Sequence, residues 1–92
     1  MLTEICFTPV QDGPSLAEGH VVIEGRFKVS GIRVVRGTHG LFVSWPSFRE
    51  APDRGSPRFP IFEILTDRDR WAAEVEILNA VVQILPEEAP RG

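Results

Sequence analysis

The sequence predicts an α+β fold, a small antiparallel β-sheet of about four or five strands followed by one amphipathic C-terminal α-helix. Up to residue 65, short apolar runs alternate with glycine and proline, a spacing that is typical of strands joined by turns. After residue 65 the apolar residues recur every three or four positions, which is the period of a helix. Because 92 residues leave room for one hydrophobic core, we expect a single domain over residues 1–86 and a short acidic tail over residues 87–92.

The first part of the chain is predicted to form three strands. Residues 2–10 are the first, and Pro9 favours an edge position because proline has no amide proton to donate to a neighbouring strand. Residues 12–15, Asp-Gly-Pro-Ser, are the turn that follows. Residues 20–24 and 26–35 lie on either side of Gly25, and so short a connection predicts a β-hairpin.

The apolar residues of the third strand change parity halfway along. Phe27 and Val29 share one face at a period of two, whereas Ile32 and Val34 belong to the other parity. A β-bulge at Gly31 would bring the apolar residues back to one face of the sheet.

Residues 41–45 are predicted to form the next strand, after a turn at residues 37–40. This strand is almost continuously apolar, which indicates a central strand covered on both faces. Pro46 ends it, and the prolines and mixed charges that follow predict a long exposed loop as far as Pro60. Residues 59–65 are expected to return as a last, irregular strand, for which Pro60 again favours an edge position.

The C-terminal helix is predicted to begin near Asp67 and to stop at Pro86. Thr66 is the expected N-cap, with Asp69 at the spacing of a capping box. Apolar residues at intervals of four and three positions form a single stripe along the helix: Trp71, Val75, Leu78, Val82 and Leu85. Three polar residues are expected on the opposite, water-facing side: Arg70, Glu74 and Gln83. We expect the apolar stripe to dock on the sheet or on a second subunit.

Residues that commonly carry chemistry are sparse in this chain. Cys6 is the only cysteine, which excludes an intramolecular disulfide and a zinc site built from paired thiolates. In a predicted strand it is expected to be a small buried residue. His20 and His39 lack a second ligand at short spacing, so no metal site and no cofactor are predicted. No motif pairs a nucleophile with a base, so we expect no catalytic residue, no small-molecule substrate and no enzymatic activity.

Compartment and core follow from the same composition. A single cysteine fits a reducing cytoplasm, and the first ten residues lack the basic start and apolar stretch of an export signal. We therefore expect a cytoplasmic protein without membrane insertion. The aromatic residues Phe42, Trp45 and Trp71 are expected to lie in the core.

Charge is unevenly distributed along the chain, although the formal net charge is only −3. Four basic residues fall in one short stretch without acids: Arg26, Lys28, Arg33 and Arg36. They form either a basic strip on one sheet face or the polar face of an amphipathic sheet, and the second interpretation is favoured. The negative excess lies in the C-terminal segment, at Glu74, Glu76, Glu87 and Glu88.

One run in the middle of the chain is distinctive. It comprises Ile32-Arg33-Val34-Val35, then Gly37, then Gly40-Leu41-Phe42-Val43, and finally Pro46-Ser47. This run resembles the signature of the stage V sporulation protein G (SpoVG) family of septation regulators, and the similarity extends thinly to the C-terminal helix. The resemblance implies a bacterial protein with an antiparallel sheet, a C-terminal helix and a homodimeric assembly. It also implies a role in septum formation or sporulation control, with binding to DNA or RNA.

The resemblance further implies nucleic-acid contacts just after the Pro-Ser pair and at the start of the helix. The basic residues of this chain at the matching positions are Arg49, Arg68 and Arg70. Phosphate contact is the functional interpretation for these three and for two further arginines of the same segment, Arg54 and Arg58. Phe48 stands where a lysine is usual, and it or Phe59 could stack on an unpaired base. Acids interleave with these arginines, so an ordinary solvated surface with paired charges is the competing interpretation. Two functions stay open: a dimeric nucleic-acid-binding regulator, and a protein-interaction module that binds a cell-division protein without nucleic acid.

Overall fold

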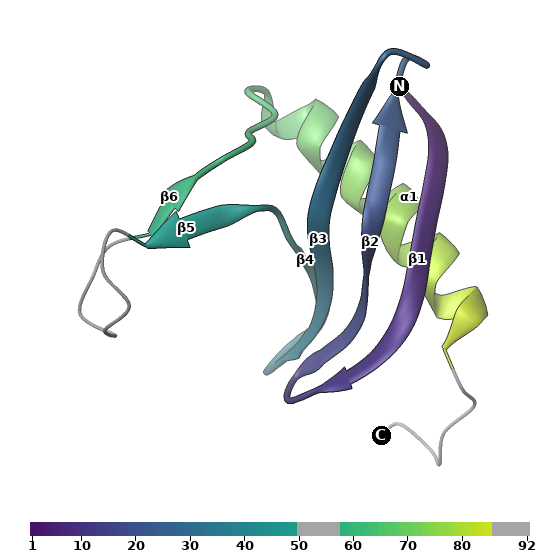
Figure 1. The fold of residues 1–92 in the computed structure, drawn as a ribbon, viewed down its shortest axis with the longest axis vertical. Helices are drawn as coiled ribbons and strands as arrows, with labels where there is room; N and C mark the ends of the chain where they lie inside the picture. Colours follow the sequence, from purple (N-terminus) through teal and green to yellow (C-terminus); the bar gives the residue numbers. More distant parts are fainter. Residues whose placement is uncertain (50–57, 86–92) are drawn as a thin grey trace.

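The computed structural model describes residues 1–49 and 58–85. Its main element is a four-stranded antiparallel sheet in the order β1-β2-β3-β4, so each strand pairs with the one that follows it in the chain. The strands are β1 (Leu2–Asp12), β2 (Ser15–Ile23), β3 (Phe27–Gly37) and β4 (Gly40–Ser44). One helix, α1 (Asp67–Ile84), lies across one face of this sheet (Figure 1). The α+β fold with a C-terminal helix is therefore confirmed.

Two short strands form a separate element that we call the arm. β5 (Ser47–Arg49) and β6 (Arg58–Pro60) pair antiparallel with each other and extend away from the sheet (Figure 1). The prediction of a long loop between Pro46 and Pro60 is therefore wrong at the two stretches that form this ladder, Ser47–Arg49 and Arg58–Pro60. The predicted strand at residues 59–65 is confirmed only at its start, because residues 61–66 are irregular. The remainder of the predicted loop, residues 50–57, lies outside the described residues.

β2 is longer than predicted and begins at Ser15, directly after the turn. The reason is a close approach between β1 and β2 at Gly19, where an added Cβ would lie 2.7 Å from the Cα of Phe7. Only glycine leaves the room that this pairing needs, so Gly19 belongs to the strand although glycine weakens strands in general. β1 lies at the edge of the sheet, as Pro9 predicted.

The bulge predicted at Gly31 is confirmed. Val21 pairs with Val29 and Gly19 pairs with Ile32, so β3 holds one residue more than β2 between these two pairs. Gly31 has a φ of +78°, a left-handed conformation that glycine adopts without steric cost. The consequence is that Val29 and Ile32 are both buried on the same face.

The prediction that residues 41–45 form a central strand is wrong, because β4 is the last strand of the main sheet. Within β4, Val43 is buried, whereas Phe42 is 49% exposed and does not belong to the core. The strand is at the edge because β5 and β6 pair with each other instead of continuing the sheet. The apolar run therefore predicted the strand correctly, but the central position that it indicated is wrong.

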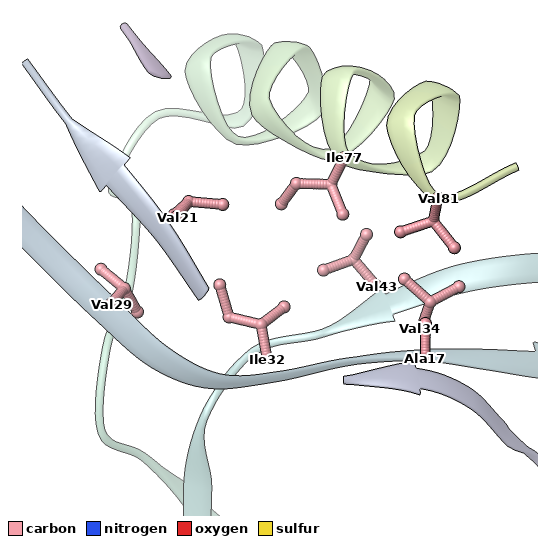
Figure 2. Close-up of a cluster of buried hydrophobic side chains, with 8 residues drawn as sticks. All are labelled: Ala17, Val21, Val29, Ile32, Val34, Val43, Ile77 and Val81. Atoms are coloured by element: carbon pink, nitrogen blue, oxygen red, sulfur yellow. The ribbon is translucent and has the colours of Figure 1, made fainter. Parts of the chain in front are cut away.

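The hydrophobic core lies between the sheet and the helix (Figure 2). It is built mainly from valine and isoleucine: Ala17, Val21, Val29, Ile32, Val34, Val43, Ile77 and Val81. Ile77 and Val81 project from α1 into this cluster, and Ala73 is also fully buried on the helix. Full burial of a side chain such as Ile77 contributes about 1.5–3 kcal/mol to folding.

The helix does not dock through the predicted apolar stripe. Its buried residues are Ala73, Ile77 and Val81, whereas Trp71 is 68% and Val82 55% exposed. A row spaced by four residues, made of one small and two β-branched side chains, lets the helix approach the sheet closely. The predicted stripe lies beside this row, and its members Leu78 and Leu85 only flank the core.

Both ends of α1 lie where the sequence predicts them. Thr66 is the N-cap and its hydroxyl accepts a hydrogen bond from the Asp69 amide, so the predicted start is confirmed. The helix ends at Ile84, as expected before Pro86.

Cys6 is exposed, and the prediction that it is buried is wrong, because its neighbours on β1 take the core-facing positions. In the described part of the chain, no helix has the length and apolar character needed to cross a bilayer.

Candidate nucleic-acid interface

The first turn of α1 carries two of the predicted arginines, Arg68 and Arg70, and both are exposed. The acids between them are engaged locally. Asp69 accepts a 2.8 Å hydrogen bond from the Thr66 hydroxyl, and Asp67 accepts one of 2.8 Å from Nη2 of Arg70. Within the described residues, Arg68 forms no ion pair. The helix therefore starts with one arginine paired to an aspartate and a second whose charge faces solvent.

The arm carries two more of the predicted arginines. Arg49 on β5 and Arg58 on β6 are register partners, and Phe48 pairs with Phe59 in the same ladder. The ladder thus places the two arginines opposite each other and the two phenylalanines opposite each other in its register. Arg54 lies outside the described residues. Figure 1 shows that the arm and the start of α1 are at different places on the molecule, joined by residues 61–66.

The root of the arm is fixed to both the sheet and the helix. The indole Nε1–H of Trp45 donates a 2.6 Å hydrogen bond to Oε2 of Glu74 on α1. The ring of Trp45 also packs against Phe62, with 5.5 Å between centroids and an interplanar angle of 40°. The amide of Ile61 donates to the carbonyl oxygen of Pro46. The prediction that Glu74 faces water is therefore wrong, since this carboxylate is half-buried and bound to the tryptophan.

A groove of about 940 Å³, which we call the sheet groove, lies between β3, β4 and the root of the arm. Among the residues that line it are Lys28, Arg33, Val35, Phe42, Ile61 and Phe62. Most of the lining residues from β3 and β4 alternate with buried core residues, so they belong to the sheet face turned away from α1; the core residue Val29 also contributes to the lining. The groove was not predicted from the sequence. Val35 and Phe42 are next to the core residues Val34 and Val43 on their strands, and this alternation could have placed them on the outer face of the sheet.

The four basic residues of β3 and its flanking turns do not act as one strip. Lys28 and Arg33 line the sheet groove, whereas the guanidinium of Arg26 lies over the ring of Phe27, 5.6 Å from its centroid. Nη1 of Arg33 is 3.3 Å from Oγ of Ser15, which is buried, and 3.9 Å from Oδ2 of Asp12. Arg33 is thereby held in position at the groove.

The two histidines of the chain lie apart from the sheet groove and from each other. Nε2 of His20 lies 3.2 Å from Oε2 of Glu4, and His20 is the register partner of Cys6. His39 is exposed in the turn between β3 and β4. Over residues 1–49 and 58–85, no three histidine, cysteine or carboxylate side chains gather so that they could hold a metal ion.

These features define a class: a small α+β protein with a four-stranded meander, one helix across one face, and arginines on an arm and at the helix start. The family model SpoVG matches residues 1–83, and the chain belongs to the SpoVG family. No curated protein matches the chain. Membership of this family supports a small protein associated with sporulation and septation, of regulator type and outside the known enzyme families.

Proposed function

We propose that this protein is a cytoplasmic regulator of septation or sporulation that acts as a homodimer and binds nucleic acid. The observation that carries nucleic-acid binding is the exposed pair Arg68 and Arg70 in the first turn of α1. A helix start favours anions because its amide groups and dipole present positive charge there. The arm adds Arg49 and Arg58, which are partners in its ladder.

The overall negative charge does not oppose this proposal strongly. Asp69 is bound to the N-cap and Asp67 to Arg70, so both acids of the first turn have local partners. Exposed charges further apart than about 8–10 Å are largely screened at physiological ionic strength. A phosphate at the helix start would therefore respond mainly to the nearby arginines and to the helix dipole.

Dimerisation is supported by the apolar stripe of α1, which the sheet leaves partly uncovered. Trp71 and Val82 are exposed, and Val75, Leu78 and Leu85 are half-buried. The intervals of four, three, four and three residues between them are those of a coiled-coil seam. Stripes of two copies can pair across a twofold axis, because such an interface is self-complementary. We propose that this stripe is the core of the dimer interface.

A protein-interaction module remains the second candidate, and one observation favours it. β1 is an edge strand of 11 residues, and an edge presents unpaired amide and carbonyl groups to a partner strand. A cell-division protein could add a strand there. Capture of such a partner should then be lost when proline replaces a residue of β1 whose amide faces outward.

The test of nucleic-acid binding is a titration with fluorescent duplex DNA and single-stranded RNA at several salt concentrations. If four phosphates are contacted, log affinity should fall with log salt at a slope of about −3.6 on duplex DNA. The double variant Arg68→Glu, Arg70→Glu should lose this binding. Arg36→Glu, an exposed change on β3 away from the helix start, is the matched control. A slope near zero, or equal binding by the two variants, would contradict the proposal.

A further inference from the structure

We propose that the sheet groove binds single-stranded nucleic acid, with a base stacked on Phe42 and phosphates beside Lys28 and Arg33. This inference rests on the proposed function, since it assigns a second contact surface to the same class of ligand. The groove lies on the sheet face turned away from α1 and is therefore distinct from the arginines at the helix start.

Phe42 is a preformed stacking platform. Its Cε1 would lie 2.8 Å from a Cβ added to Gly37, so the ring rests directly on the glycine backbone across the hairpin. With that side supported, the ring is still 49% exposed and lines the groove. Stacking on an exposed aromatic ring does not depend on base identity, because every base has a π face.

The charged residues around this platform suit a phosphate backbone. Lys28 and Arg33 line the groove on β3, and Glu18, the register partner of Arg33, is the acid among the lining residues. Arg33 is oriented by the Ser15 hydroxyl and approaches Asp12 only at 3.9 Å. Lys28 forms no ion pair within the described residues. Among the lining residues two cations therefore stand against one acid, and Lys28 is the cation that no described carboxylate pairs with.

The groove is continuous with the arm. Pro46, Ser47 and Ile61 line its far end, and Ser47 is the first residue of β5. A strand of nucleic acid that leaves the groove at this end meets the ladder in which Arg49 and Arg58 are partners. This continuity favours an extended polyanion over a compact ligand. It also favours an unpaired strand, because the bases of a duplex are stacked on one another and do not expose their faces to Phe42.

The experiment compares fluorescein-labelled rU12 with a 12-base-pair DNA duplex by anisotropy, using the full chain. Phe42→Ala should weaken rU12 binding by roughly 5- to 150-fold, the range of one lost base stack, and leave the duplex unaffected. Phe27→Ala is the matched control, since Phe27 is 58% exposed but lies outside the groove. Lys28→Gln should lower the salt slope for rU12 by about 0.7, whereas Arg36→Gln should not. Phe42→Leu, which keeps an apolar side chain without the ring, replaces Phe42→Ala if the latter fails to fold.

The outcomes separate this inference from the function on which it rests. If the wild type binds rU12 and only the groove variants weaken it, the groove is a binding site. If rU12 binds but Phe42→Ala, Phe42→Leu and Lys28→Gln all match the wild type, the groove proposal is overturned and nucleic-acid binding stands. If the wild type binds neither probe at low salt, both proposals are overturned.

Discussion

The indole of Trp45 and the carboxylate of Glu74 are joined by a 2.6 Å hydrogen bond that connects the segment after β4 to the second turn of α1. The donor and acceptor are both half-buried, and a hydrogen bond to a carboxylate is stronger than one between neutral groups. It ties the helix to the strand from which the arm departs.

Replacing Glu74 with alanine should therefore destabilise the fold by about 1.5–3 kcal/mol, the range for hydrogen bonds to charged groups. The free energy of unfolding from urea titration measures this. Glu76→Ala, an exposed glutamate two positions along the same helix, should change stability by less than about 0.5 kcal/mol. Equal losses from the two changes would show that the Trp45 contact contributes nothing.

The second prediction concerns which helix residues support the core. Ile77→Ala should destabilise the protein by about 2–5 kcal/mol, because it removes a fully buried side chain and leaves a cavity. At low protein concentration, where the monomer prevails, Trp71→Ala should have a small effect despite the size of the ring, since 68% of Trp71 is exposed. Thermal and urea unfolding of both variants check this. A larger loss for Trp71→Ala than for Ile77→Ala would contradict the observed docking face.

The third prediction tests the proposed dimer interface. Val82→Glu should convert a dimer to a monomer, because it places a charge within the apolar stripe. Sedimentation equilibrium at high micromolar concentration gives the mass. Leu65→Glu is the control, since Leu65 is 88% exposed and precedes the helix. A monomeric wild type, or a dimer that Val82→Glu leaves intact, would exclude the stripe as the interface.

The fourth prediction compares two glycines of the sheet. Gly31→Ala should cost about 1–2 kcal/mol from backbone strain alone, because its φ is +78° and no atom lies within 4 Å of the added Cβ. Gly19→Ala should cost at least as much, about 1–3 kcal/mol, since its Cβ would overlap the backbone of β1 at Phe7. Urea unfolding gives both values, and amide exchange should show β1 opening only in the Gly19 variant. Protection of β1 in that variant equal to the wild type would contradict the close approach.

Part of the fold was predictable because it depends on short stretches of chain. The Gly31 bulge follows from the parity change between Val29 and Ile32, and the helix start follows from Thr66 and Asp69. Both features are determined by backbone conformation and hydrogen bonding among near neighbours, which the local sequence specifies.

The candidate site was predictable only in part. The resemblance indicated Arg68 and Arg70, and the structure places both on the surface of the first helical turn. The sheet groove was not predicted, because Phe42 was assigned to the core. Its exposure depends on α1 covering only the other face of the sheet, and which face a helix covers is a property of the tertiary structure.

The sequence by itself determined the class of fold, the approximate positions of the helix and of most strands of the main sheet, and the family, since these depend on periodicity, turn residues and a distinctive run of residues. Only the tertiary structure decided which apolar residues are buried. Helix α1 offers two overlapping apolar rows, and the row of Ala73, Ile77 and Val81 docks on the sheet while Trp71 and Val82 remain exposed. The physical reason is packing: small and β-branched side chains allow close contact with a sheet face of valine and isoleucine, and this fit depends on the shapes of both surfaces.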